Sequence, residues 1–223
     1  MHDMPKQLVE FLNKYPSRQL KRGWPLLYQG EIPRTAFVIK TGVVKVYDIN
    51  SAGEEKVVNF SADGDIAPSA WVFDKSPVAL YYYEAFTDCE AYTVPRDKLR
   101  EALESSEVTL KYALDHYVAL YVGTMMHIYA LEQTKATEKL LRILQYLSMR
   151  YGEKTTTNLR RIQLRLTHQD LARLIGMTRE TTAVELGKLK KHGLIAYQNQ
   201  RYLIDMKKVQ LVLGEDELEN IHI

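Results

Sequence analysis

The feature that most constrains the fold of this chain is a pair of short helical patterns, separated by one glycine, between residues 167 and 195. Thr167 precedes the first pattern, and Asp170 follows where its carboxylate can accept from the free backbone amide of Thr167. Gly176 provides the backbone freedom of a sharp turn, and Thr178 is placed to cap the second pattern. The sequence thus predicts two helices joined by a tight turn. Their spacing predicts a buried face made of Leu171, Ala172, Leu174, Ile175, Thr182, Leu186 and Leu189.

The second helix also has a charged face, with Arg179 and Glu180 in its first turn and Lys188, Lys190 and Lys191 toward its end. Arginine can donate two hydrogen bonds to guanine, and glutamate can accept from the amino group of cytosine. An ordinary helical hairpin with solvated charges is the alternative interpretation. The order of cap, turn glycine, second cap, Arg-Glu pair and lysine-rich end instead favours a DNA-binding helix-turn-helix.

The net charge of +2 conceals regions of opposite sign. Residues 135–213 carry 16 Lys and Arg against 6 Asp and Glu, whereas residues 1–134 carry 14 against 18 and residues 214–223 carry 4 acidic residues. A basic region beside an acidic remainder is the charge pattern of a nucleic-acid-binding module joined to another domain.

The single cysteine, Cys89, excludes an internal disulfide and a metal centre held by several thiolates. A lone cysteine in a strand-rich region is more often a small buried side chain than a nucleophile. The best candidate for a membrane span, residues 117–131, has only 15 residues, and the N-terminus lacks the apolar core of a secretory signal. We therefore expect a cytoplasmic protein with no membrane partner.

Residues 5–20 predict a short amphipathic helix, and residues 23–95 change to short β-like runs separated by glycines. Thr41-Gly42 is predicted to be a hairpin turn. The predicted strands are residues 36–39, 43–47, 56–60, 80–86 and 91–94. Short strands at this spacing predict a β-sandwich or roll, which can be an enzyme scaffold, a ligand pocket or an interaction domain.

A metal-dependent enzyme of this fold would need imidazoles and carboxylates that converge inside the roll. Residues 5–100 contain no histidine, and the chain has no Gly-x-Ser-x-Gly elbow, Walker loop or dinucleotide fingerprint. We therefore predict that the protein is not an enzyme, with no catalytic residue, no bound metal and no cofactor.

A long helical pattern follows over residues 96–133. Its apolar stripe starts at Leu103, and from Leu110 onward the spacing alternates between four and three residues, which is a heptad pattern. A helix packed on its own roll would have a wider, less regular stripe, so we favour a dimer helix. The predicted interface residues are Leu110, Leu114, Tyr117, Tyr121, Thr124, Ile128 and Leu131. His116 and His127 lie outside the stripe and are interpreted as packing or surface residues rather than haem ligands.

A further helix is predicted over residues 137–150, with Thr137 as its cap, followed by a loop over residues 152–159. Two β-like runs flank a polar turn at Asn199 and predict the wing of a winged helix. Arg201, beside that turn, is predicted to contact phosphate.

The arrangement resembles the CRP/FNR superfamily of bacterial transcription regulators over nearly the whole chain. The resemblance rests on the recognition segment at residues 177–182 and on residues 193–195, together with the turn glycines Gly30, Gly42, Gly53 and Gly64. It implies an α+β fold, with an N-terminal β-roll of the double-stranded jelly-roll type at residues 1–100, a dimerisation helix at 101–134 and a C-terminal winged helix-turn-helix domain at 135–223. Members bind inverted repeats in double-stranded DNA as homodimers, and RNA polymerase is a further candidate partner.

By this resemblance, Arg179 and Glu180 would contact bases, and Thr178 and Thr181 would contact phosphate. Val184 stands where many members carry a second arginine, and valine can touch a thymine methyl but cannot hydrogen-bond a guanine. We therefore expect an operator that differs at that base. The predicted DNA-binding residues are Thr178, Arg179, Glu180, Thr181, Val184, Lys188 and Arg201.

Cyclic-nucleotide binders of this superfamily hold the cyclic phosphate with an arginine, but this chain has none between Arg34 and Arg96. A buried phosphate without a cation is costly, so cyclic AMP is disfavoured as the effector. The cysteine set of the iron-sulfur oxygen sensors is absent too. We expect an unidentified apolar or aromatic effector, in a pocket formed by Trp71, Tyr81, Tyr82 and Tyr83. The alternatives are a roll with an aromatic core that binds nothing, beside constitutive DNA binding, and a roll-type small-molecule enzyme.

Overall fold

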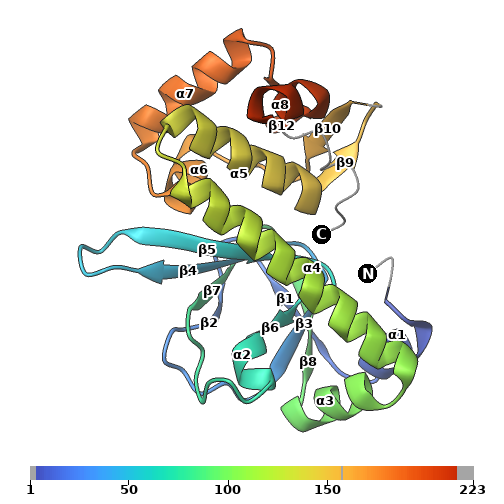
Figure 1. Ribbon diagram of the computed structural model, residues 1–223. Coiled ribbons are helices and arrows are strands. Elements are labelled where there is room, and N and C mark those ends of the chain that lie inside the picture. The colour runs from blue at the N-terminus through green and yellow to red at the C-terminus, as the bar shows by residue number, and fades with distance from the viewer. Residues whose placement is uncertain (1–3, 157, 215–223) are drawn as a thin grey trace. The chain divides into compact units, whose positions relative to one another are not determined.

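The computed structural model describes residues 4–156 and 158–214. The chain divides into two compact units between Asp115 and His116, and Figure 1 labels most elements of both. This division falls within the helical segment that the sequence assigns to residues 101–134. Among the described residues, no helix combines the length and the apolar character needed to cross a membrane.

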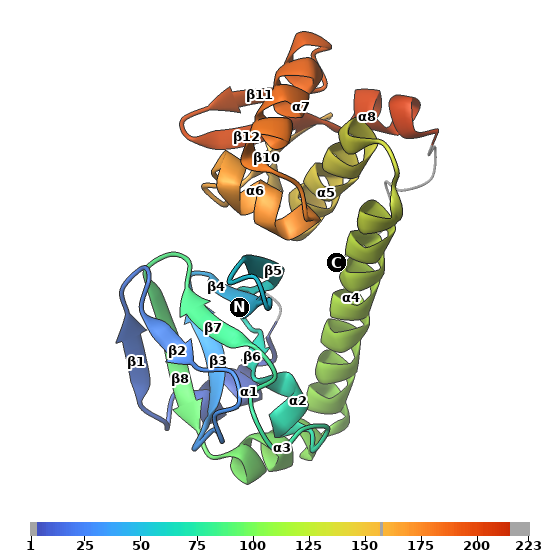
Figure 2. The same ribbon diagram turned by 90° about the vertical axis from the view of Figure 1, so that its left-hand side faces the viewer.

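The N-terminal unit is a β-roll of two antiparallel four-stranded sheets (Figure 2). Its strands are β1 (Ser17–Leu20), β2 (Pro25–Leu27), β3 (Ala36–Thr41), β4 (Val44–Ile49), β5 (Glu55–Ser61), β6 (Ile66–Ala67), β7 (Tyr82–Ala85) and β8 (Cys89–Val94). One sheet has the strand order β1-β8-β3-β6, and the other has the order β2-β7-β4-β5. The predicted roll of jelly-roll type is confirmed.

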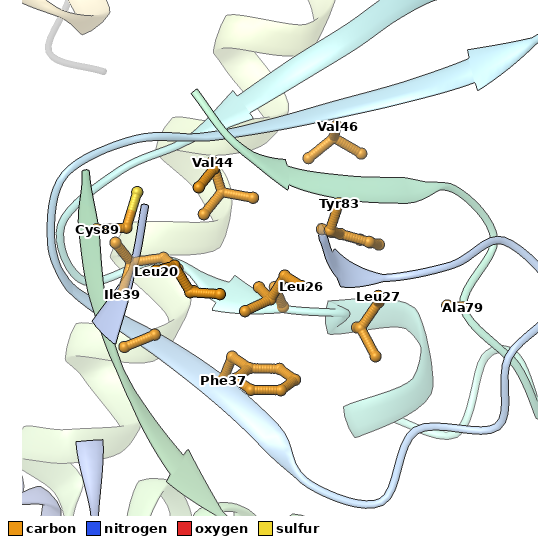
Figure 3. Close-up of a cluster of buried hydrophobic side chains, with 13 residues drawn as sticks. Leu20, Leu26, Leu27, Phe37, Ile39, Val44, Val46, Ala79, Tyr83 and Cys89 are labelled. Atoms are coloured by element: carbon orange, nitrogen blue, oxygen red, sulfur yellow. The ribbon is translucent and has the colours of Figure 1, made fainter. Parts of the chain in front are cut away.

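The interior of the roll is filled by apolar side chains from both sheets. Val44 and Val46 of β4 and Tyr83 and Ala85 of β7 are buried there, because alternate residues of a strand point to the same face. Figure 3 shows labelled members of this interior cluster pointing toward one another. Burial raises the pKa of the Tyr83 hydroxyl to about 12.

Gly42 does not form the predicted hairpin turn, because β3 and β4 belong to different sheets. The chain instead crosses from one sheet to the other at this residue, with a φ of 89°. A Cβ atom at Gly42 would lie 2.4 Å from the carbonyl oxygen of Asp88, so only glycine fits. The hairpin lies further on, at Asn50 to Gly53, where the Asn50 side chain accepts from two backbone amides and β4 turns into β5.

The helix predicted over residues 5–20 is shorter than expected, since α1 (Lys6–Leu12) gives way to β1. Pro16 prevents the helix from continuing toward residue 20, because proline disfavours a helical conformation in the residue before it. Leu8 and Leu12 of α1 lie in a second apolar cluster, which also contains residues of the short helix α2 (Ser69–Val72).

The continuous helix predicted over residues 96–133 consists of two helices, α3 (Arg96–Glu104) and α4 (Glu107–Glu132). Ser106 starts the second one. Its hydroxyl accepts from the backbone amide of Thr109 at 3.2 Å, and its own backbone amide donates to the Thr109 hydroxyl at 3.2 Å. This reciprocal cap explains the break. Leu103 is therefore buried in the second apolar cluster and does not belong to the α4 stripe.

The C-terminal unit contains a winged helix. After α4 it consists of α5 (Ala136–Arg150), β9 (Gly152–Lys154), β10 (Leu159–Ile162), α6 (His168–Ile175), α7 (Arg179–Lys191), β11 (Ile195–Gln198), β12 (Arg201–Asp205) and α8 (Met206–Leu213). The loop predicted over residues 152–159 contains β9, which pairs with β10 in a sheet of order β11-β12-β10-β9. Thr137 is not the cap of α5, because Lys135 occupies that position and Thr137 lies in the first turn.

Candidate nucleic-acid interface

α6 and α7 form the helix-turn-helix that the sequence predicts. The Thr167 hydroxyl accepts from the backbone amide of Asp170 at 3.1 Å, and the Asp170 carboxylate accepts from the backbone amide of Thr167 at 2.8 Å. Gly176 ends α6 with a φ of 64°, and the Thr178 hydroxyl caps α7 by accepting from the backbone amide of Thr181. Local hydrogen bonds thus fix the start of both helices.

α7 packs against α5 and α6 through its predicted inner face. Leu186 and Leu189 are buried, and the buried Thr182 hydroxyl donates to the carbonyl oxygen of Thr178 at 2.8 Å. His127 of α4 is also buried, with its Nε2 atom 2.9 Å from the carbonyl oxygen of Leu174 on α6. His127 is therefore a packing residue, as predicted, and its ring helps to hold α6.

The outer face of α7 presents the residues predicted to contact bases. The side chains of Arg179 and Glu180 are 63% and 79% exposed, and their nearest charged atoms are 3.9 Å apart. Val184 is 59% exposed. Thr178 and Thr181 are exposed as well, and their hydroxyl oxygens lie 2.8 Å apart. An exposed ion pair of this length contributes little to stability, so Arg179 and Glu180 can exchange it for an external partner at little cost.

Glu185 is a buried carboxylate on α7 that the sequence reasoning missed. One of its oxygens accepts from Lys188 at 2.6 Å, and the other accepts from the hydroxyl of Thr137 on α5. These two hydrogen bonds hold the pKa of Glu185 below its usual range, the bond from Lys188 contributing most. Lys188 thus has a partner within the domain, although its side chain is 53% exposed, and its predicted DNA contact stays a prediction. A spacing argument could not find this pair, because Thr137 lies on another helix.

The Glu185→Gln variant is expected to destabilise the C-terminal unit by about 1–3 kcal/mol at pH 7, the usual value for hydrogen bonds to a charged group. Because the folded-state pKa is lowered, the stabilisation is fully present above the unfolded-state pKa of about 4.3 and is lost as the pH falls through the folded-state value. Circular dichroism during thermal unfolding at several pH values measures the difference from wild type. Glu180→Gln on the exposed face should show no such difference, and an equal loss in both variants would contradict the role of Glu185.

The wing is formed by β11, β12 and a tight turn in which Asn199 and Gln200 have φ values of 51° and 62°. Arg201 is half-buried, and its Nε atom donates to the carbonyl oxygen of Gln163 at 3.2 Å. Nε is therefore used to hold the wing, and the terminal nitrogens of Arg201 are the donors to consider for phosphate. The Nζ atom of Lys190 lies 5.1 Å from the ring centroid of Tyr197 on β11.

α4 presents most of its predicted stripe to solvent. Leu114 and Tyr121 are 62% and 65% exposed, and only Tyr117 of the seven stripe residues is half-buried. The exposed apolar face is wider than the predicted stripe, because Val118 and Met125 are also exposed. Thr124 satisfies its hydroxyl within the helix by donating to the carbonyl oxygen of Leu120 at 2.9 Å. Such an apolar face on a long helix is typical of a surface that another chain covers.

The four aromatic side chains predicted to form an effector pocket lie in different environments. Tyr83 is buried inside the roll, whereas Tyr82, its neighbour on β7, stacks on Tyr47 with 5.2 Å between the ring centroids. Adjacent residues of a strand point to opposite faces, so Tyr82 and Tyr83 cannot line one cavity. Trp71 belongs to the second apolar cluster, and Tyr81 packs against the interior of the roll. The structure does not bring the four rings together.

Cys89 is buried, and its thiol donates to backbone carbonyl oxygens, among them that of Val43 at 3.0 Å. Burial raises the pKa of this thiol, which disfavours the reactive thiolate. Among the residues that the structure describes, no three His, Cys, Asp or Glu side chains are grouped so that they could hold a metal ion.

Comparison with known proteins extends these observations to nearly the whole chain. The family of the cyclic nucleotide-binding domain matches residues 17–106, and that of the Crp-like helix-turn-helix domain matches residues 138–211. The global nitrogen regulator of Synechococcus elongatus is 25% identical over 83% of this chain and 84% of its own length. The nitrogen fixation regulation protein FixK of Rhizobium meliloti is 27% identical over 84% of this chain and 81% of its own length.

Comparison with solved structures agrees with these family matches at the level of the fold. A CRP-family transcriptional regulator from Thermus thermophilus superposes with a TM-score of 0.70 at 17% identity, covering 89% of this chain and 97% of that protein. The relatives and the structure named here are regulators rather than enzymes. Together with the relatives, the two family matches show that the chain belongs to the CRP/FNR superfamily of bacterial transcription regulators.

Proposed function

We propose that this regulator binds an inverted repeat in double-stranded DNA as a homodimer, with one α7 helix in the major groove of each half-site. The observation that carries the proposal is the position of Arg179 and Glu180. Both lie exposed on the first turn of a helix whose opposite face is anchored by Leu186, Leu189 and Thr182. A rigid helix that presents a bidentate donor and an acceptor at its N-terminus has the geometry for contacting base edges.

Arg179→Ala is expected to cost about 1–3 kcal/mol of binding free energy and to relax the base preference at one position of each half-site. Fluorescence anisotropy with an inverted-repeat duplex and its single-base variants measures both effects. Lys191→Ala is the matched control, because Lys191 is exposed at the other end of α7 and should affect all sequences alike through phosphate. Lys188 is unsuitable as this control, because its loss would also leave Glu185 without its cation. If Arg179→Ala lost the same binding free energy on every duplex, this result would contradict a base contact by Arg179.

Val184 supports an operator that differs from sites read by a second arginine. Its side chain is exposed one turn beyond Glu180 and offers only methyl groups to the groove. Thr178 and Thr181 are exposed at the start of α7, which supports phosphate contacts there. The terminal nitrogens of Arg201 on the wing are further candidate donors to phosphate.

The homodimer is supported by the exposed face of α4. The heptad spacing of Leu110, Leu114 and Tyr121 matches the geometry of a two-stranded coiled coil, and burying such side chains stabilises by about 1.5–3 kcal/mol each. Two-fold symmetry would then present two α7 helices to the two halves of the repeat. An effector, if it acts through α4, would do so by changing this arrangement.

The roll supports an effector other than a cyclic nucleotide. Among the described residues of its interior cluster, none is basic. The nearby cation Lys45 lies on the opposite face of β4, where its Nζ atom binds Glu55 at 2.7 Å and Glu84 at 3.2 Å. A cyclic phosphate would have to replace buried apolar contacts without gaining a cation. The filled interior also supports the second candidate, a constitutive DNA binder.

Titration of the full-length protein with cyclic AMP or cyclic GMP is expected to give no saturable heat at micromolar concentrations, because the described interior cluster of the roll contains no basic side chain that could hold the phosphate. Isothermal titration calorimetry makes the measurement, with circular dichroism as the check that the protein is folded. A saturable isotherm with either nucleotide would refute this expectation while leaving the DNA contacts untouched.

A further inference from the structure

A groove of about 540 Å³ lies on the C-terminal unit, where the last turns of α7 meet α8 and the start of α5. Its volume falls in the range of small-molecule binding sites, which is about 300–1,000 Å³. It is separate from the roll and from Arg179 and Glu180, which lie at the other end of α7.

The apolar part of the groove comes from two buried and two exposed side chains. Leu189 of α7 and Leu194 are buried, whereas Leu211 and Val212 of α8 are 68% and 61% exposed. Exposed apolar side chains that border a groove can bury more of their surface against a ligand than scattered surface residues can. The groove can therefore accept an aliphatic chain or a ring.

The polar part of the groove is basic, because Lys188, Lys208 and His192 line it together with Thr137, and none of the acidic residues that the structure describes lines it. The Nδ1 atom of His192 lies 2.8 Å from the carbonyl oxygen of Lys188. A carbonyl oxygen only accepts, so Nδ1 carries the hydrogen, and Nε2 of the neutral ring can then only accept.

Both lysines already have acidic partners outside the groove lining. Lys188 binds Glu185 at 2.6 Å, and Lys208 lies 3.4 Å from Asp205 and donates to the carbonyl oxygen of Gly193 at 3.1 Å. An ammonium group has three donors, so each lysine can still serve a further acceptor. Because their charge is partly balanced, the groove suits a ligand with one negative charge better than a phosphate dianion.

We propose that this groove binds a small amphipathic carboxylate, with its apolar part on Leu189, Leu211 and Val212 and its carboxylate toward the ammonium group of Lys208. Such a ligand would contact α5, α7 and α8 at once, and would stabilise the C-terminal unit by binding only its folded state. Any effect on DNA affinity rests on the proposed function, but the binding itself does not.

The test uses the full-length protein without DNA and sodium octanoate as the probe. Calorimetry is expected to show saturable binding of octanoate and none of octanamide, which has the same chain without the charge. Lys208→Gln should raise the Kd about tenfold or more, as for the loss of one charge-assisted hydrogen bond. The matched control is Lys207→Gln, because Lys207 is the exposed neighbour outside the groove and its loss should leave the Kd unchanged.

Val212→Asn is the second variant, and because this side chain is exposed the change should weaken octanoate binding without unfolding α8. Absence of octanoate binding to the wild type, or an equal Kd in Lys208→Gln and Lys207→Gln, would overturn the proposal. Failure of DNA binding alone would bear only on the proposed function, since no DNA is present in this experiment.

Discussion

A chain carrying Leu114→Glu together with Tyr121→Glu is expected to be monomeric and to bind an inverted repeat about 10²–10⁴ times more weakly than the wild type. Both side chains are more than half exposed on α4, so the changes should leave the fold of each unit intact. Two carboxylates facing two others across a heptad interface would repel each other in a low-dielectric contact. The affinity falls because a monomer contacts one half-site and loses the second, linked contact.

Sedimentation velocity and anisotropy on full and half-site duplexes measure the two consequences separately. Lys111→Glu is the control, because it changes the net charge by the same −2 at an exposed position outside the stripe. It should remain dimeric. If the double variant still sediments as a dimer, α4 is not the interface, and if it is monomeric with full affinity, the second half-site contributes nothing.

Gly42→Ala is expected to destabilise the roll by about 3–5 kcal/mol, combining the strain of a positive φ with overlap against the backbone. The Cβ atom would lie 2.4 Å from the carbonyl oxygen of Asp88 and 2.8 Å from the Cα atom of Cys89. Neither atom is the end of a flexible side chain, so the backbone at Gly42 and the backbone at Asp88 and Cys89 would have to move apart. Urea unfolding followed by tryptophan fluorescence reports this, because both tryptophans, Trp24 and Trp71, lie in the N-terminal unit.

The Gly53→Ala variant separates the cost of a positive φ from the cost of overlap between the new Cβ atom and the backbone. Gly53 also has a positive φ, of 77°, but nothing lies within 4 Å of the position its Cβ would take. Its loss should therefore be about 1–2 kcal/mol, the cost of the left-handed conformation alone. Equal losses at Gly42 and Gly53 would show that the crossing between the sheets tolerates a side chain.

Features set by neighbours in the sequence were predictable, and the helix-turn-helix is the clearest case. The caps and the turn glycine of this motif act on backbone groups only a few residues away along the chain. Their spacing alone therefore fixes where α6 and α7 begin and where α6 ends; the residues are Thr167, Asp170, Gly176 and Thr178. Strand periodicity likewise predicted the roll. The base and phosphate contacts of the exposed residues, the dimer and the effector stay predictions.

One local feature and one feature set by contacts in space were missed. The reciprocal cap at Ser106 and Thr109 was within reach of the sequence, but the regular apolar spacing across it concealed the break between α3 and α4. The aromatic residues from Trp71 to Tyr83 are close in sequence, yet alternation along β7 and separate apolar clusters keep their rings apart.

The sequence by itself thus determined the class of the two units and the exposed face of α7, because caps, turn glycines and periodicity act over short distances along the chain. Only the tertiary structure decided that Gly42 crosses between sheets and that Glu185 is buried between Lys188 and Thr137. Those outcomes depend on which surfaces meet in space. A buried carboxylate needs partners, and nothing in the local sequence of α7 states that α5 supplies one of them.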